Sequence, residues 1–423
     1  MQIKISGAET LLFNDKKPYT KKCDIYITDD IISGVDKAPE GFSADKTIDG
    51  TNRLVIPGLV NAHTHAYMSI FRNIADDLEF NDWLFGRILP LEDKLGTEDI
   101  YWGTLLGALE MTATGTTSYI DMTIEMEGSV RGALDSGLRA TVSRGLVGEG
   151  ANEGGAVRLA ENLKYLPMQN DRFSVILGPH APYTCDPEYL KIVTASAKEY
   201  SLPLTIHLSE SLKEVEDIKK AYGCSPIELM EKIGLFDVPV TAAHCVQLSD
   251  TDIAILARNG VTVATNPISN AKLANGFAPL VKLNRAGVNI AIGTDSAASN
   301  NTLNMFSDIN FASLVHKGTG HDPLAVSASE AIYFATAGGA AALSKKTGKI
   351  EEGYLADIAI LNTDLPQFYP RNDYVAALCY SANGSEVETV ISGGEILMEN
   401  KEFKKLDKER IYFECEKIVE RIK

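Results

Sequence analysis

The chain has 423 residues, of which 45% are apolar and 23% charged, and its formal net charge is −17 at pH 7. This length and composition are typical of a globular protein with room for a barrel and an appended domain. The negative charge argues against nucleic acid or an anionic membrane as the main partner, because both require positive potential. No apolar run approaches the roughly 18 residues of a membrane span, and MQIKISGAETLLF does not resemble a secretory signal.

The cysteines are scattered, and none forms a C-x-x-C pair. Free thiols in a reducing compartment are the expected state for this pattern in a long chain. We therefore expect a cytoplasmic protein without disulfides. The six cysteines are Cys23, Cys185, Cys224, Cys245, Cys379 and Cys415.

Short strands are predicted at both ends of the chain. Residues 1–53 alternate apolar and polar positions between turn signals such as Asp-Asp, Ser-Gly and Asp-Gly, and residues 355–363 and 386–403 repeat the pattern. We predict a small β-sandwich assembled from the two ends.

The predicted boundaries follow from these end segments. Residues 1–56 and 356–423, including a C-terminal helix, are expected to form the composite sandwich domain. Residues 57–355 are expected to form the catalytic domain.

Between the ends, eight apolar strand-like runs alternate with helical patterns such as residues 99–115 and 187–200. This alternation predicts a (β/α)8 barrel of the TIM type. The alternative is an open doubly wound sheet, which often carries a glycine-rich phosphate loop after its first strand, and no such loop is present. The runs are residues 54–60, 117–122, 138–143, 173–178, 203–208, 239–244, 261–265 and 288–293.

The first run leads into a pair of histidines. Residues 54–60 form a continuous apolar stretch, as expected for a parallel strand buried on both faces, and His63 and His65 follow. Residues two apart in an extended segment point to the same side, so the two imidazoles are placed to share a metal. Two histidines alone would also fit ordinary core or loop positions.

The polar residues at the other predicted strand ends strengthen the metal hypothesis, because barrel enzymes carry their chemistry at the carboxyl ends of the strands. Five of the seven histidines fall there. His316 and His321 lie in a later helical region and are expected to be solvated or capping residues. In strand order the end residues are His63, His65, Arg144, His180, His207, Glu210, His244, Asn266 and Asp295.

Three histidines and one carboxylate from this group suit a divalent metal that keeps a position open for water. Such a metal lowers the pKa of its water from 15.7 to about 7, so a hydrolytic reaction is predicted. Glu210 is close enough to the third histidine to shuttle a proton, or else it is a solvated carboxylate at the start of a helix. His244 is a further ligand or a group that holds the nucleophile. The four predicted ligands are His63, His65, His207 and Asp295.

Nearly the whole chain carries, in order, the motifs PGLVNAHTHAYMSIFR, DDLEFNDWL, LPLE, GPHAPYT, HLSE, AAHC, NPISNAKLANG and GTDSAASNN. Together these motifs resemble the amidohydrolase superfamily. They resemble most closely the 5-methylthioadenosine/S-adenosylhomocysteine deaminases and their chlorohydrolase-like relatives. The resemblance implies a barrel-plus-sandwich fold and one divalent metal, with zinc preferred and Fe²⁺ or Mn²⁺ as alternatives.

The resemblance assigns the same four metal ligands. A single metal is expected because the fourth strand ends in Gly178-Pro179-His180, without the carboxylated lysine that bridges two metals in binuclear members. It makes Glu210 the proton donor to the substrate ring, with Asp295 and His244 as further catalytic groups.

The resemblance also implies which residues contact the substrate. Glu92, Arg144 and His180 are expected in the substrate site together with Glu210, and Glu92 is expected to take the ribose hydroxyls. One position departs from the family, since Leu89 stands where relatives commonly have Trp in a W-P-x-E stretch. This difference affects the shape of the pocket and therefore the exact substrate.

The predicted reaction is hydrolytic deamination of an adenine nucleoside (5′-methylthioadenosine, S-adenosylhomocysteine or adenosine) to the inosine analogue and ammonia. The alternative enzyme is a deaminase or chlorohydrolase for guanine, a pterin, cytosine or a triazine. A catalytically inactive barrel retained for binding is a third possibility, against which the complete ligand set argues. The expected partners are a small nucleoside and further copies of the chain, as a dimer or tetramer, with no nucleic acid and no membrane.

Overall fold

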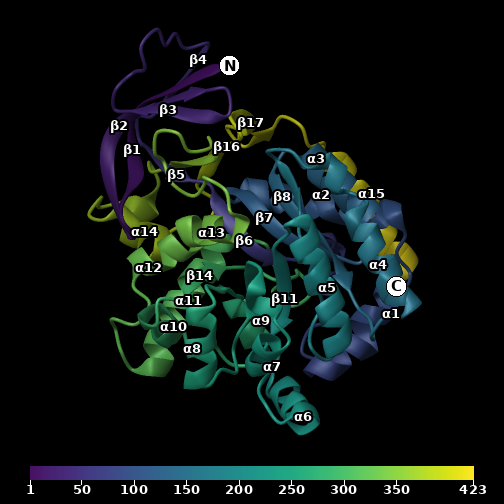
Figure 1. Ribbon diagram of the computed structural model, residues 1–423. Coiled ribbons are helices and arrows are strands. Elements are labelled where there is room, and N and C mark those ends of the chain that lie inside the picture. The colour runs from purple at the N-terminus through teal and green to yellow at the C-terminus, as the bar shows by residue number, and fades with distance from the viewer.

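The structure, a computed structural model, describes residues 1–423 and contains a barrel of eight parallel strands, the fourth of them interrupted (Figure 1). The (β/α)8 prediction is confirmed, and the open-sheet alternative is wrong. The barrel strands are β6 (Leu59–Thr64), β7 (Thr116–Thr123), β8 (Arg139–Leu146), β9 (Phe173–Val175) with β10 (Gly178–Pro179), β11 (Leu204–Leu208), β12 (Val240–His244), β13 (Thr262–Thr265) and β14 (Asn289–Ile292).

The barrel consists of two sheets, one with the strands β6 to β10 and the other with the strands β11 to β14. The barrel closes where these sheets meet, at two seams. Leu177 bridges to Leu204 at one seam, and Thr64 bridges to Asp295 at the other. The Asn61 amide crosses the second seam, donating to Thr294 Oγ1 over 2.7 Å and accepting from the Thr294 N–H over 3.0 Å. Closure therefore brings the carboxyl ends of the first and last strands together.

Helices surround the barrel, and local signals set their ends. In α5 the Asp186 side chain caps the Tyr189 N–H over 2.7 Å, Pro187 opens the first turn, and Ser201 ends the helix in the left-handed conformation. None of the helices combines the length and apolar character needed to cross a bilayer. The surrounding helices are α2 (Thr97–Ala113), α3 (Met126–Ser136), α4 (Glu153–Leu163), α5 (Pro187–Tyr200), α6 (Leu212–Tyr222), α7 (Pro226–Lys232), α8 (Asp250–Arg258), α9 (Pro267–Lys272), α10 (Leu280–Arg285), α11 (Met305–Gly320), α12 (Ala328–Tyr333) and α13 (Gly339–Leu343).

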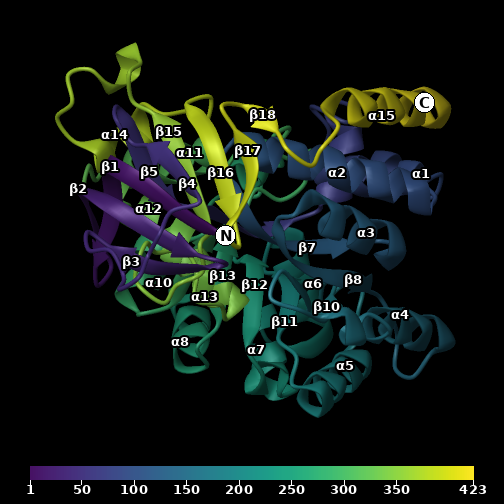
Figure 2. The same cartoon turned by 90° about the horizontal axis from the view of Figure 1, so that it is seen from above.

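Both ends of the chain build one nine-stranded sheet, in which β5 pairs with β1 on one side and with β15 on the other (Figure 2). Isoleucines from both ends, including Ile3, Ile25, Ile358 and Ile391, share its core. The predicted β-structure from the two ends is confirmed, whereas the exact domain boundaries remain a prediction. The strands are β1 (Gln2–Asn14), β2 (Lys17–Thr28), β3 (Ile31–Val35), β4 (Lys46–Asp49), β5 (Arg53–Pro57), β15 (Ile358–Asn362), β16 (Val387–Ser392), β17 (Glu395–Glu399) and β18 (Glu402–Phe403).

After this sheet the chain ends in α15 (Lys408–Ile422), which packs beside α2 (Figure 2). The Lys94 ammonium donates to the Ile422 carbonyl over 2.6 Å and fixes the end of α15. The remaining helix of this region is α14 (Tyr374–Tyr380).

The single strand predicted over residues 54–60 is wrong, because the structure divides it between two sheets. β5 belongs to the end sheet and β6 to the barrel, with Gly58 between them. A Cβ on Gly58 would lie 2.0 Å from Thr117 Oγ1, so only glycine allows this close approach. The sequence gives no sign that the chain passes from one sheet to the other, because both strands are buried and together form one continuous apolar run.

A buried ion pair joins the barrel to the end sheet. Arg139 at the start of β8 donates to both Asp357 oxygens, over 2.9 and 3.1 Å, and the two residues are 2% and 1% exposed. Asp357 also accepts from Thr347 Oγ1 over 2.8 Å and from the Gly393 N–H over 2.7 Å. The Asp357 carboxylate at this junction therefore accepts four hydrogen bonds, two from Arg139 and one each from Thr347 and Gly393.

Asp357→Ala is expected to destabilise the protein by about 3–5 kcal/mol, because it leaves the Arg139 charge buried without a partner. Denaturant unfolding followed by circular dichroism measures the loss. Asp217→Ala is the control, since the Lys213–Asp217 pair on α6 is exposed and is worth at most about 1 kcal/mol. Equal losses in the two variants would contradict this account of the junction.

Candidate active site

A cavity of about 500 Å³ opens at the carboxyl ends of the barrel strands. Its outer wall is the segment after β6, where a π-helical turn (Asp82–Ile88) leads into α1 (Leu89–Glu92). Trp83 anchors this wall, with its Nε1–H donating to the Ala298 carbonyl over 3.3 Å. The predicted site residues that line the cavity are His65, Glu92, Arg144, His180, His207, Glu210, His244 and Asp295.

The four predicted metal ligands converge at the cavity floor. Asp295 Oδ1 lies 3.5 Å from His63 Nε2 and 3.4 Å from His65 Nε2. His65 Nε2 lies 3.2 Å from His207 Nε2. Two ligand atoms placed about 2.1 Å from one tetrahedral ion are about 3.4 Å apart. The spacing and the N3O donor set therefore fit a single divalent ion.

The hydrogen bonds of the imidazoles leave their Nε2 atoms free for such an ion. The Nδ1 atoms of His65 and His207 lie 2.7 Å from the carbonyl oxygens of Met122 and His180. A carbonyl only accepts, so each Nδ1 carries the proton and each Nε2 keeps its lone pair. His63 Nε2 is buried and makes no hydrogen bond. A buried nitrogen without a partner is rare and fits a metal ligand.

Burial also keeps His63 and His207 neutral, as metal ligands must be. It lowers the pKa of His63 to about 4 and holds the pKa of His207 well below its ordinary value. Burial alone would raise the pKa of Asp295, but the neighbouring imidazoles outweigh it and the pKa lies well below its ordinary value. The site therefore presents neutral nitrogens and an ionised carboxylate at neutral pH.

Two hydroxyls orient the Asp295 carboxylate. Ser269 Oγ donates to Asp295 Oδ2 over 2.6 Å and Ser299 Oγ donates to it over 2.8 Å, which leaves Oδ1 to face the histidines. Asp295 has a φ of 60°, a left-handed conformation that is uncommon outside glycine. Such strained positions cluster at functional sites.

Glu210 and His244 face each other beside the ligand cluster. His244 Nε2 lies 3.8 Å from Glu210 Oε2, and the Nδ1 of His244 donates to Asn270 Oδ1 over 2.8 Å. Asn275 Nδ2 donates to Glu210 Oε1 over 3.0 Å. Burial raises the pKa of Glu210; it would lower the pKa of His244, but the carboxylates of Glu210 and Asp295 outweigh burial and raise it. The pair is placed to exchange protons with a bound molecule.

The other side of the cavity carries the predicted substrate contacts. Tyr67 OH donates to Glu92 Oε1, and burial raises the pKa of Glu92 to about 7. Arg144 Nε pairs with Glu161 Oε2 at 3.0 Å, so part of its guanidinium is already engaged. Burial lowers the pKa of His180 to about 4, and its Nδ1 lies 2.9 Å from Thr184 Oγ1.

Several residues that support the site were not predicted. Ser269, Asn270 and Asn275 all lie in the stretch NPISNAKLANG. Their spacing within this stretch was the sequence feature that could have predicted their place in the site. Tyr67 had none, because it lies in an apolar run. His316 was expected to be solvated or capping; it is instead buried, its ring nitrogens 2.8 Å from the Ala312 and Ala278 carbonyls, so that expectation is wrong. His321 does cap α11.

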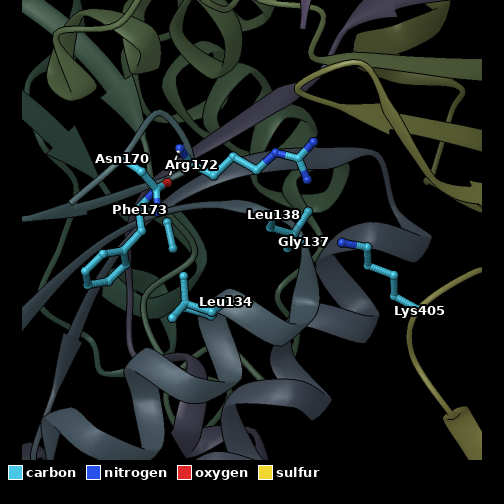
Figure 3. A pocket seen from close by; sticks show the side chains of 9 residues that line it. Leu134, Gly137, Leu138, Asn170, Arg172, Phe173 and Lys405 are labelled. Atoms are coloured by element: carbon cyan, nitrogen blue, oxygen red, sulfur yellow. Dashed lines mark hydrogen bonds between the residues drawn. The ribbon is translucent and has the colours of Figure 1, made fainter. Parts of the chain in front are cut away.

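A second, smaller cavity of about 210 Å³ lies where β8 and β9 begin, at the opposite ends of the barrel strands (Figure 3). Leu134 and Phe173 form part of its apolar wall, and Lys405 reaches toward it from the segment after β18. Its two cationic residues, Arg172 and Lys405, both pair with Glu395, at 2.6 and 2.9 Å. One carboxylate thus pairs with both cations of the smaller cavity.

Curated relatives match the chain along almost its entire length. A 5-methylthioadenosine/S-adenosylhomocysteine deaminase from Thermoanaerobacter pseudethanolicus is 44% identical over 423 residues, covering 99% of this chain and 98% of that protein. A 5′-deoxyadenosine deaminase from Methanocaldococcus jannaschii is 42% identical over 406 residues, covering 95% and 96%.

Solved structures share the fold. A zinc-bound adenosine deaminase from Xanthomonas campestris has a TM-score of 0.94 at 29% identity, covering 99% of this chain and 98% of its own. An atrazine chlorohydrolase from Arthrobacter aurescens, complexed with zinc, has a TM-score of 0.91 at 26% identity, covering 99% and 100%. The model of the amidohydrolase family matches residues 54–397, from the strand before His63 into the end sheet. With that match over most of its length and relatives above 40% identity, the chain belongs to the amidohydrolase family.

Proposed function

We propose that the protein is a metal-dependent aminohydrolase that converts an adenine nucleoside, such as 5′-methylthioadenosine, S-adenosylhomocysteine or adenosine, to its inosine analogue and ammonia. The observation that carries this proposal is a single cavity lined by His65, His207, Asp295, the buried acid Glu210 and the opposite carboxyl Glu92, with His63 buried beside Asp295. The names of the curated relatives point to the same class of substrate.

A divalent metal, when bound by this cluster, supplies the acidified water that attack on the ring requires. Asp295 accepts a proton from the attacking water through the carboxylate that Ser269 and Ser299 hold. Glu210, whose pKa burial raises, protonates the ring nitrogen next to the reacting carbon, which allows that carbon to become tetrahedral. His244 stabilises the negative charge that develops on oxygen. The amino group then takes the proton that Asp295 accepted and leaves as ammonia, and the remaining hydroxyl proton returns to Glu210 as the carbonyl of the product forms.

We propose zinc as the metal. Three imidazole nitrogens and one carboxylate oxygen suit zinc, which would take the water as a fifth ligand, and two solved relatives carry zinc. Fe²⁺ and Mn²⁺ are the alternatives with the same donor set. Elemental analysis of the purified protein distinguishes the three metals, and a protein without metal would favour the inactive-barrel hypothesis.

An ammonia-release screen tests the substrate class. The panel contains adenosine, 5′-methylthioadenosine, S-adenosylhomocysteine, guanine, cytosine and a chlorinated triazine, the last read by chloride release. Turnover of the nucleosides with a kcat/KM at least about tenfold above that of the other compounds supports the proposal. Preference for guanine, cytosine or the triazine would replace the nucleoside proposal with a hydrolase for another heterocycle. The reason to test these compounds is Leu89, which stands where relatives commonly have Trp.

Glu92→Ala is expected to impair ribonucleosides far more than a free base, because the carboxylate offers two acceptor oxygens to the vicinal hydroxyls. One lost charge-assisted contact predicts about 1.5–3 kcal/mol, or about 10- to 150-fold in kcat/KM. A 2′,3′-dideoxy substrate should show a similar loss with the unmutated enzyme and little further loss with the variant. Equal effects on nucleoside and base would mean that Glu92 only shapes the pocket.

We also propose that the enzyme is cytoplasmic and that it forms an oligomer. All six cysteines are free and buried, which supports a reducing cytoplasm. Assembly as a dimer or tetramer is also proposed, and light scattering of the purified protein tests it.

A further inference from the structure

The start of α6 differs from the starts of the three other helices in which serine is the N-cap residue and an acidic residue follows three positions later. Four helices have Ser at the position before the first turn and an acidic residue three positions later, the pattern of a capping box. In α7, α8 and α12 the acid closes the box by accepting the N–H of its own serine over 2.8 Å. In α6 the corresponding acid, Glu214, does not bind the Ser211 N–H.

Glu214 instead reaches back into the turn that follows β11. Its Oε1 accepts the Ser209 N–H over 2.8 Å, and its Oε2 accepts the Glu210 N–H over 2.9 Å. Ser209 has a φ of 52°, and this left-handed residue aims two successive N–H groups at one anion. Glu214 is only 3% exposed and has no cationic partner, so these two backbone groups are its main ligands.

The turn held by Glu214 connects Glu210, the proposed proton donor, with His244, which is proposed to stabilise the developing negative charge. It carries Glu210, whose Oε2 lies 3.8 Å from His244 Nε2. The Ser209 carbonyl also accepts the N–H groups of Val246 and Gln247, over 3.0 and 2.9 Å, in the loop that follows His244. The position of Glu210 relative to His244 therefore depends on the conformation of this turn.

We propose that Glu214 is a positioning residue for proton transfer: its carboxylate holds the Ser209–Glu210 turn so that the Glu210 carboxyl faces the reacting ring. This inference rests on the proposed function, because it takes Glu210 as the proton donor. It adds a residue that touches neither substrate nor metal cluster and acts only through the backbone of Glu210.

The substitution Glu214→Gln tests the proposal with little change in side-chain shape. The amide has one acceptor oxygen instead of two and places its own N–H groups against a backbone N–H. We expect kcat to fall about 10- to 100-fold, as for a small misplacement of a catalytic group. KM and the metal content should stay unchanged, because Glu214 itself lies outside the cavity lining and is not among the four proposed ligands.

Asp252→Asn is the matched control. Asp252 is 2% exposed and accepts the Ser249 N–H over 2.8 Å at the start of α8, outside the cavity lining. Asp252→Asn should lower the melting temperature about as much as Glu214→Gln does, and it should leave kcat unchanged. Glu214→Asp, which keeps the charge but is one methylene shorter, is made as a second variant and should fold with an intermediate kcat.

A double-mutant cycle separates positioning from a structural role. In a Glu210→Gln background, Glu214→Gln should cause no further loss of kcat, because the group that it positions is gone. Equal loss in both backgrounds, a changed KM or metal content, or chains that fail to fold with either Glu214 substitution would overturn the positioning role. A normal kcat for Glu210→Gln alone would instead refute the proposed function of Glu210.

Discussion

His207→Ala is expected to release the metal and to lower kcat for ammonia formation by at least about 10³-fold. The His207 Nε2 is 3.2 Å from the His65 Nε2 at the centre of the ligand cluster, so the substitution removes one of the four proposed metal ligands. Without the metal, the pKa of the attacking water returns from about 7 toward 15.7, which removes nearly all hydroxide at neutral pH. The measurements are the metal-to-protein ratio by elemental analysis and kcat on the best nucleoside of the screen.

His316→Ala is the control for the loss of a buried imidazole. Its ring is held by two backbone carbonyls outside the cavity lining, so the variant should lose stability but keep both metal and kcat. Retention of one metal per chain and of kcat in His207→Ala would remove His207 from the ligand set. Treatment of the unmutated enzyme with a chelator should reproduce the His207→Ala loss, and added zinc should reverse it only in the unmutated enzyme.

Glu210→Gln is expected to lower kcat by about 10²- to 10⁴-fold, the usual contribution of a general acid or base. Glutamine keeps the shape of the side chain and can still accept from Asn275, but its amide does not deliver a proton to the ring. The metal content should stay at the unmutated value, because Glu210 is not among the four ligands. Single-turnover kinetics and elemental analysis on the same preparation separate the two effects.

Glu216→Gln provides the matched control, since Glu216 lies on α6 and is exposed. It should leave kcat unchanged. A Glu210→Gln enzyme with bound metal and near-normal kcat would show that the proton comes from another group, and His244 would be the next residue to replace. A joint loss of metal and activity would mean that Glu210 also shapes the ligand cluster.

The barrel was predictable because parallel strands are buried on both faces and appear in the sequence as separate apolar runs. The same rule explains where the prediction failed. Leu54–Val60 is apolar throughout, but the chain changes sheets at Gly58, and burial alone does not distinguish one buried sheet from another. The fourth strand is similarly interrupted into β9 and β10 within one predicted run.

The candidate site was predictable to the extent that strand ends meet. His63 lies in β6 and His65 directly follows that strand, and the residues that end the other strands converge because a barrel brings all carboxyl ends to one face. Glu92 had no such signal, since it lies on a loop helix and only the family resemblance singled it out. Its place in the cavity depends on how the segment after β6 folds over the barrel mouth.

The sequence by itself determined the barrel, the sheet built from both chain ends, and the local spacing that presents histidines at strand ends, because these features depend on short-range patterns of apolar and polar residues. Only the tertiary structure decided which hydrogen bond each side chain makes. The Ser-x-x-acid pattern is the same at Ser211 and Ser249, yet Asp252 caps its own helix while Glu214 binds the turn that carries Glu210. The difference arises because the left-handed Ser209 follows β11, so that the N–H groups of Ser209 and Glu210 both point at Glu214.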